Sequence, residues 1–317
     1  MCVRCVPLRG SPRERGNITE SKRKGSYQTM KVAIATDTNS GMTREKAREQ
    51  GIYLLPMPVI IEDKMYLEGT DITSAQLYEA MHQHQTISSS QPSPGQILEF
   101  WDGILQDGYD EIVYIPMSSG LSNSCCNAIR FSQEYEGKVQ VVDNHRISVT
   151  QETSVQCAQK LAGQGMGAKE IREYLEQRAY DASIYITVDS MEYLKKGGRI
   201  TPAAAAFATV LNLKPVLTIQ GDKLDVYTKA RGMKQAETKM IEAVRQDRLT
   251  RFGEVPDSQL RVETAGTFES EEQAQRWRQL VQAEFPTIPV SYVQLPCSIA
   301  CHVGINAAGT GIVKKEA

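Results

Sequence analysis

The chain has 317 residues, enough for two domains, and its 41% hydrophobic and 23% charged residues are typical of a globular protein; no apolar run reaches the ~20 residues that a membrane-spanning helix needs. The formal net charge of −2 divides into +5 over residues 1–30 and −7 over the rest, and an acidic body disfavours nucleic acid as a partner of the main domains. Seven cysteines lack the spacing of a disulfide framework and no signal-peptide apolar region is evident, so we expect a cytoplasmic protein with reduced thiols.

The first 30 residues combine seven Lys or Arg with two acidic residues and show no hydrophobic periodicity, so we predict that they are disordered. One interpretation is a basic arm that contacts nucleic acid or an anionic membrane surface. The interpretation that we favour is an initiation codon assigned too early, with Met30 as the true start, because Lys31 opens the first regular strand. Cys2 and Cys5 form a C-x-x-C pair, but no second ligand pair lies nearby, so no metal site is expected.

From Met30 onward, apolar runs rich in β-branched residues alternate with helical patterns. The runs predicted as strands span residues 31–36, 53–60, 111–116, 139–142, 184–188, 217–219, 223–227, 259–264 and 290–294. Several of these runs are apolar throughout, as is typical of strands that are covered on both faces.

Helix starts are marked by capping residues. Ser93-Pro94 combines an N-cap with a proline in the first turn, and it precedes a predicted helix over residues 95–106 that Gly108 ends. Thr201-Pro202 repeats this start before an alanine-rich helix.

Strands that alternate with helices predict an α/β fold with a mostly parallel sheet. Two consecutive helical stretches, residues 149–165 and 168–179, precede a new strand and place a domain boundary near Asp181. We therefore predict an N-terminal, Rossmann-like α/β domain over residues 31–181 and a C-terminal α/β domain over residues 182–317.

A run of hydroxyl side chains, Ser88-Ser89-Ser90, leads into the helix start at Ser93. Short hydroxyls together with the free backbone N–H groups of a helix N-terminus can bind an anion. Taken alone, however, the run is better explained as a polar loop before a helix cap.

A second hydroxyl loop, Ser118-Ser119-Gly120-Leu121-Ser122, follows the predicted strand over residues 111–116 and precedes a helix. Open α/β sheets bind ligands at this end of their strands, and a glycine lets backbone amides approach a carboxylate or phosphate. Capping of the helix by Ser118 or Ser119 would explain the same residues. The sequence favours neither anion binding nor helix capping over the other.

Three further segments carry a charge or an imidazole. Gly197-Gly198-Arg199 is either a turn that aims a guanidinium at an anion or a helix end with solvated charges. The apolar segment 203–219 follows it and forms either part of the core or the wall of a cavity. Arg231 belongs to a basic loop, and a solvated surface without a binding role would explain this loop as well. His302 lies among small apolar residues, where a lone histidine is more often part of the core.

Signatures of catalytic nucleophiles and of nucleotide binding are missing from the sequence. It contains no G-x-S-x-G at a strand-to-helix turn, no G-x-x-x-x-G-K-[ST] and no G-x-G-x-x-G after a strand. We therefore expect neither independent enzymatic activity nor a cofactor.

Taken in order, these segments resemble the DegV family from about Lys31 to Gly311. The motifs that carry the resemblance are Thr36-Asp37-Thr38, Leu55-Pro56-Met57-Pro58-Val59 followed by Asp71-Ile72-Thr73, Ser89-Ser90-Gln91-Pro92-Ser93, Ser118-Ser119-Gly120-Leu121-Ser122, the run YLKKGGRI from Tyr193 to Ile200, and Arg231 with Lys234. Each motif is weak by itself, whereas the ordered set is specific.

The resemblance implies two α/β domains with a tunnel between them that holds a long-chain fatty acid. It also implies a binding subunit without catalytic residues, whose partner, a fatty-acid kinase similar to dihydroxyacetone kinase, phosphorylates the bound carboxylate. Transient membrane contact is compatible with such a carrier. The residues implied around the carboxylate are Ser89, Ser90, Ser118, Ser119 and His302, and those implied at the mouth or facing the partner are Arg199 and Arg231.

Two departures from the family pattern concern this site. Ser89 stands where the family usually has threonine, and the His-Thr-Gly-Pro-Gly run of the family is replaced here by His302-Val303-Gly304-Ile305-Asn306, which leaves the role of the histidine open.

The alternative hypothesis is an enzyme or binding protein for a small phosphorylated metabolite, with the loop from Ser118 to Ser122 as the anion cradle.

Overall fold

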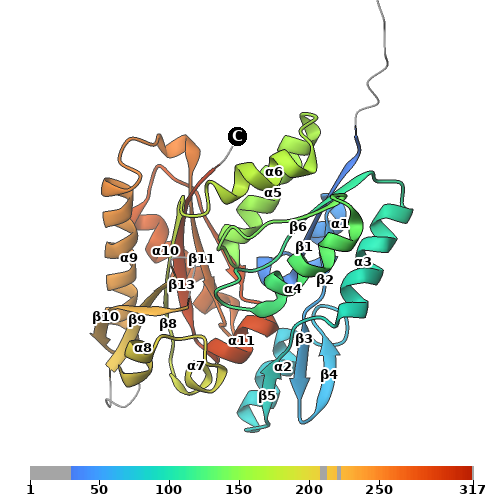
Figure 1. The fold of residues 1–317 in the computed structure, drawn as a ribbon. Helices are drawn as coiled ribbons and strands as arrows, with labels where there is room; N and C mark the ends of the chain where they lie inside the picture. The colour runs from blue at the N-terminus through green and yellow to red at the C-terminus, as the bar shows by residue number, and fades with distance from the viewer. Residues whose placement is uncertain (1–29, 208–212, 220–222, 316–317) are drawn as a thin grey trace, which may run out of the picture.

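The computed structural model describes residues 30–207, 213–219 and 223–315. The first residues, for which we predict disorder, therefore lie outside the described residues. The middle of the apolar segment 203–219 lies outside them as well. Figure 1 shows two α/β halves side by side, with helix α11 (Cys297–Val303) between them. In the described ranges, no helix combines the length and the hydrophobicity that crossing a lipid bilayer requires.

The N-terminal half is built on a four-stranded parallel sheet with the order β2-β1-β6-β7, which confirms the predicted Rossmann-like arrangement. The strands are β1 (Val32–Asp37), β2 (Tyr53–Leu55), β6 (Glu111–Ile115) and β7 (Val139–Val141). The helices are α1 (Arg44–Glu49), α3 (Pro94–Gln106), α4 (Asn123–Ser132), α5 (Val149–Gly163) and α6 (Ala168–Glu176), with short 3-10 helices at Thr38–Ser40 and Gln133–Tyr135.

Alternate residues of the central strands explain why this sheet is covered on both faces. In β1, Ile34 belongs to the same core cluster as Leu161 of α5, whereas Ala35 belongs to the cluster that contains Trp101 of α3. Helix α3 begins as predicted, because Ser93 caps it and a proline occupies its first turn.

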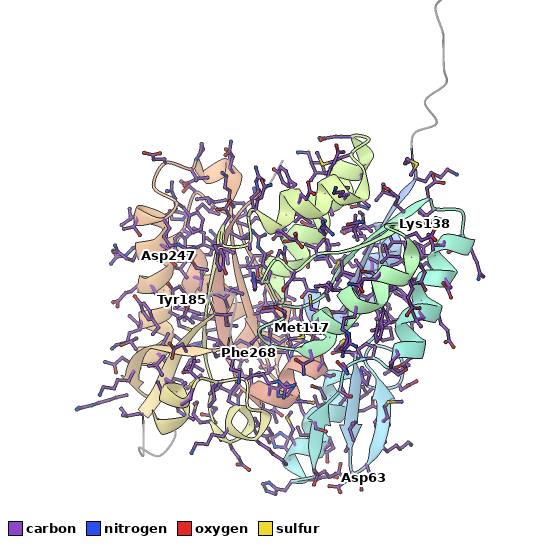
Figure 2. The ribbon with its side chains drawn as sticks, viewed as in Figure 1. Asp63, Met117, Lys138, Tyr185, Asp247 and Phe268 are labelled. Atoms are coloured by element: carbon purple, nitrogen blue, oxygen red, sulfur yellow. The ribbon has the colours of Figure 1, made fainter. Side chains whose placement is uncertain are left out.

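A small antiparallel sheet with the order β4-β3-β5 adjoins the N-terminal half. It comprises β3 (Pro58–Ile61), β4 (Lys64–Leu67) and β5 (Ile87–Ser89), and it packs against α2 (Ser74–His82) and α11. Asp63 lies at the tip of its β3–β4 hairpin (Figure 2). The single strand predicted over residues 53–60 was wrong, because the chain leaves the first sheet at Pro56 and the backbone N–H of Met57 donates to Thr38 Oγ1 (3.1 Å) instead of to a neighbouring strand.

The C-terminal half is a six-stranded mixed sheet with the order β10-β9-β8-β13-β11-β12. Its strands are β8 (Ala182–Thr187), β9 (Leu213–Ile219), β10 (Asp225–Arg231), β11 (Leu260–Gly266), β12 (Val290–Gln294) and β13 (Ala308–Lys314). Its helices are α7 (Glu192–Gly197), α8 (Pro202–Phe207), α9 (Met233–Thr250) and α10 (Glu271–Glu284), with a 3-10 helix at Asp257–Gln259.

Most neighbouring strands of this sheet run antiparallel, and β11 with β12 is the parallel pair among the described strands. The parallel arrangement that the alternation predicted is therefore a property of the N-terminal sheet. Helices α9 and α10 cover one face, where Met240 and Trp277 pack with Val262 and Ile312 of the strands. Figure 1 shows α9 on the side away from the N-terminal half, so the opposite face of the sheet is turned toward that half.

Candidate functional site

A cavity lies between the two halves, and the empty space in it, with its open mouth included, is about 970 Å³. Its apolar lining comprises Met57, Met117, Leu121, Ile147, Val149, Ile184, Ile186, Leu194, Ile219, Leu224, Ala265, Leu295, Ile299 and Val303. Met117, which follows β6, lies where the two halves meet (Figure 2). Many of these side chains also belong to one apolar cluster, so packed apolar side chains from both halves surround the cavity.

Gly309 on the central strand β13 leaves room for this cavity. Gly309 lies between Ile186 of β8 and Ala265 of β11, and those two side chains line the cavity while the glycine presents none. Residues that are paired across β8, β13 and β11 form a row on this face of the sheet. The next row is centred on Gly311 and lies two residues, or ~7 Å, farther along the strands. Since α11 follows the end of β12, the row at Gly309 is the nearer to α11 and the row at Gly311 lies deeper.

The end of the cavity beside α11 carries polar groups. Ser89, the last residue of β5, and His302 of α11 share a hydrogen bond of 2.7 Å between Ser89 Oγ and His302 Nε2, and both residues line the cavity together with Ser90. Helix α11 packs on the small sheet, where Cys301 and Ile87 belong to one apolar cluster. This packing fixes the distance between the serine and the histidine.

The imidazole of His302 is neutral at physiological pH. Burial lowers its pKa to about 4, and the charge of Arg199 acts in the same direction. Its Nδ1 is buried, has no hydrogen-bond partner among the described residues, and lies against Gly197, where a Cβ would clash with it. With the proton on Nε2, His302 donates to Ser89 Oγ and leaves the hydroxyl proton of Ser89 free for a ligand.

Arg199 brings a positive charge to the same region of the cavity. Its guanidinium donates to the carbonyl of Gly197 and, at 3.3 Å from Nε, to the carbonyl of Leu121. These two bonds hold the side chain between the halves. A guanidinium fixed in this way attracts a carboxylate to the polar end.

A buried polar network borders the cavity behind this pair. Ser298 Oγ lies 2.9 Å from Asn39 Oδ1 and 2.8 Å from Glu68 Oε2, and Thr38 Oγ1 donates to Glu68 Oε2 at 2.7 Å. Burial raises the pKa of Glu68, and its hydroxyl partners act against that shift. Asn39 Nδ2 and Ser148 Oγ line the cavity region, are buried, and have no hydrogen-bond partner among the described residues.

The sequence analysis missed this network, whose members come from segments far apart in the chain. One signal was present, because Asp37-Thr38-Asn39-Ser40 is a polar run directly after a buried strand, at the sheet edge where ligands bind. Ser148 gave no such signal: its φ of 56° is unusual for a residue with a Cβ, and only the fold shows it.

Asp37 holds the loop after β6 in place beneath the cavity. Its carboxylate accepts hydrogen bonds from the backbone N–H groups of Asn39 (3.0 Å) and Met117 (3.1 Å) and from Gln151 Nε2 (3.1 Å). Complete burial raises its pKa to about 6 in spite of these donors. Asp37 therefore acts on the site by positioning the backbone around Met117.

Comparison with known proteins places this fold and cavity in a family. A family model described as an uncharacterised protein of the DegV family matches residues 31–315. The chain belongs to the DegV family. Among curated DegV domain-containing proteins, one from Deinococcus radiodurans is 32% identical over 217 residues, which are 68% of this chain and 77% of that protein. One from Listeria innocua is 26% identical over 88% of this chain and 97% of its own length.

Solved structures share the two-domain fold. A protein from Thermus thermophilus, described by its fatty-acid binding, superposes with a TM-score of 0.79 at 26% identity, over 90% of this chain and 100% of its own. A stearic-acid-binding protein from Eubacterium ventriosum superposes with a TM-score of 0.80 at 20% identity, over 90% of this chain and 98% of its own. At that lower identity, the second likeness is evidence for the fold alone.

In this DegV-family chain, four of the predicted site residues line the cavity: Ser89, Ser90, Arg199 and His302. Ser118 and Ser119 belong to the loop after β6 but are not part of the lining, which takes Leu121 and Ser122 from the same loop. Arg231 is exposed at the end of β10, an edge strand of the C-terminal sheet. The roles assigned to these residues stay predictions.

Proposed function

We propose that this chain binds a long-chain fatty acid in the cavity between its halves and presents the carboxylate to a partner kinase. The observation that carries the proposal is the apolar cavity with the pair of Ser89 and His302 at one end. The fatty-acid binding of the Thermus thermophilus relative supports it, since that protein is 26% identical and its whole length is covered.

The apolar walls can supply the affinity. Each buried CH₂ group contributes ~0.8 kcal/mol, so a chain of roughly 16 carbons contributes on the order of 12 kcal/mol before the costs of ordering it. A carboxylate must be hydrogen-bonded when it leaves water. The hydroxyl of Ser89 and the charge of Arg199 can meet that requirement, and Ser90 lines the cavity next to Ser89.

The kinase role is what the resemblance to the DegV family implies, and the lack of a nucleotide-binding motif in the sequence is compatible with a partner that binds ATP. ATP would be bound by a kinase subunit similar to dihydroxyacetone kinase. A carboxylate oxygen of the ligand would attack the γ-phosphorus, the bond from that phosphorus to the bridging oxygen would break, and an acyl phosphate and ADP would result. Exposed Arg231 is our candidate for contact with the kinase, and a cytoplasmic location with transient membrane contact during loading belongs to the same proposal.

Hydrogen bonding in the loop after β6 argues against a phosphate cradle for a small metabolite. The backbone N–H of Ser119 donates to Asp143 Oδ1 (3.2 Å), and that of Gly120 donates to Ser118 Oγ (3.1 Å). The next two N–H groups, of Leu121 and Ser122, donate to the carbonyl of Ser118. A cradle needs free amides and no neighbouring carboxylate, so the apolar ligand is favoured.

Mass spectrometry of lipid extracted from the natively purified protein tests the binding step. We expect about one fatty acid per chain, and a well-folded preparation without lipid would contradict the proposal. The kinase step is tested separately by adding a dihydroxyacetone-kinase-like subunit from the same genome with Mg²⁺ and ATP, then trapping acyl phosphate with hydroxylamine. Lipid in the protein without any trapped product would reject the kinase role and leave the binding role standing.

A further inference from the structure

Glu263 places a carboxyl group in the deeper part of the cavity wall. It lies on β11, two residues before Ala265 and therefore on the same face of the sheet, in the row that is centred on Gly311. The residue is only 2% exposed, yet it lines a cavity whose other deep walls include Ile184 and Ile219. A carboxyl group is an unexpected neighbour for the methyl end of a saturated chain.

One oxygen of this carboxylate is bound and the other is not. Oε1 accepts hydrogen bonds from the guanidinium of Arg261 and from Ser291 Oγ (3.0 Å). Oε2 is buried and has no hydrogen-bond partner among the described residues. A buried polar atom without a partner destabilises the protein, and more so when it is charged, so a ligand that supplies a donor here would bind more tightly.

Neighbouring side chains fix the orientation of the carboxylate. Arg261 also donates from Nη1 to Gln156 Oε1 (2.6 Å), and Gln156 Nε2 donates to Glu152 Oε1 (2.7 Å), which pairs with Lys46 Nζ (2.7 Å). This chain of contacts joins α1 and α5 of the N-terminal half to β11. This chain of contacts contains two positive and two negative groups, so the negative charge of Glu263 is balanced by a positive one. Its Oε1 is bound to Arg261.

We propose that the cavity is built for a fatty acid that carries a hydroxyl group on the part of its chain far from the carboxylate, where the hydroxyl donates to Oε2 of Glu263. This inference rests on the proposed function, because it needs the carboxylate to lie at the end formed by Ser89 and His302. It adds the class of ligand: hydroxylated acyl chains are preferred over plain saturated chains of equal length.

Binding of stearic acid and of monohydroxystearic acids to the delipidated protein tests the inference. The hydroxyl is moved stepwise from the carboxyl end to the methyl end. We expect affinity to peak at one distal position, about ten-fold above stearic acid, the effect of one hydrogen bond to a charged group. If every hydroxystearic acid binds no better than stearic acid, Glu263 is satisfied by water and the inference fails. If none of the acids binds, the proposed function itself fails.

Two variants and one control sharpen the result. Glu263→Met should remove the preference and favour stearic acid. In Glu263→Gln the amide oxygen faces Arg261, so the NH₂ group faces the cavity, and the preference should move to the matching oxostearic acid; this variant decides the case if the methionine variant does not fold. Ser291→Ala, which touches Oε1 alone, should keep the wild-type preference. An unchanged preference in both Glu263 variants would overturn the inference.

Discussion

Ser89 and His302 stand 213 positions apart in the chain and share a hydrogen bond of 2.7 Å at the polar end of the cavity. The bond joins β5 of the small antiparallel sheet to α11, the helix that lies between the two halves. Because it depends on two segments that are distant in sequence, the polar end forms only when the small sheet and the C-terminal half are assembled together.

Replacing Ser89 with alanine tests the role of this pair. The Ser89→Ala variant should bind a fatty acid about ten-fold more weakly, since one hydrogen bond to a charged carboxylate is lost. The neighbouring Ser88→Ala variant is the matched control, because Ser88 is exposed, lies next to it in the same strand and is not part of the cavity lining. Titration with a fluorescent fatty acid measures both, and equal affinities would rule out a binding role for Ser89.

Filling the cavity beside β13 with a larger side chain should exclude the ligand without unfolding the protein. A Cβ at Gly309 would meet its nearest atom at 3.6 Å, an ordinary contact, so Gly309→Ala should fold and retain its lipid. In Gly309→Leu the longer side chain should occupy the cavity between Ile186 and Ala265. We expect extracted Gly309→Leu to contain little or no fatty acid and to melt at the temperature of the delipidated wild type. Full lipid occupancy in the leucine variant would show that the ligand lies elsewhere.

Gly197 should tolerate no side chain, because a Cβ there would clash with His302 Nδ1. The Gly197→Ala variant should lose about 1–3 kcal/mol of unfolding free energy, and the displaced imidazole should lose its bond to Ser89. Gly198→Ala is the control: its φ of 67° strains an alanine, but nothing lies within 4 Å of the new Cβ. NMR spectra of the imidazole should therefore change in the first variant and stay constant in the second.

The depressed pKa of His302 predicts a pH dependence. The folded protein takes up this proton only near pH 4, whereas the unfolded chain takes it up near pH 6.5, so the stability contributed by the neutral imidazole is lost as the pH falls between these values. Asp37, whose pKa is raised to about 6 by burial, acts in the opposite sense over a similar range. Comparison with a His302→Gln variant cancels the contribution of Asp37.

The difference in unfolding free energy between the wild type and His302→Gln should therefore shrink by up to about 3 kcal/mol as the pH falls from 6.5 to 4. Denaturant melts at a series of pH values measure it. A difference that stays constant across this range would mean that the imidazole titrates alike in the folded and unfolded states.

The proposed kinase contact is tested at the edge strand β10. Arg231→Ala should leave fatty-acid binding unchanged and reduce acyl phosphate formation by about ten-fold, because one charged contact with the partner is lost. Lys229→Ala is the matched control, since Lys229 is exposed two residues earlier on the same face of the same strand. Equal losses in both variants would indicate a general effect of surface charge rather than a specific contact.

Local signals predicted much of the fold. Ser93 and the proline after it marked the start of α3, and the apolar runs marked the parallel strands of the N-terminal sheet. β13 escaped prediction because Gly309 and Gly311 give it little strand propensity. The break at Pro56 was missed because it depends on a bond to Thr38, a contact outside any local pattern.

The candidate site was predictable in part. Motifs led to Ser89, Arg199 and His302, which the structure brings to one cavity. Asn39 belongs to a polar run after a strand, which was the one signal for it, whereas Glu263 is a lone polar residue within a strand and has no distinctive spacing. Their relevance follows from burial and from atoms without partners among the described residues, which are properties of the assembled fold.

β13 stands in the middle of its six-stranded sheet although it is the last of the described strands along the chain. During translation, β8 and β11 would wait for a neighbour that leaves the ribosome long after them, and contacts of such sequence separation form slowly. The wall of the cavity that β8 and β11 form with β13 is therefore complete only after β13 has been synthesised. Any ligand of this cavity must then bind after that strand has joined the sheet, and not while the chain extends only as far as β11.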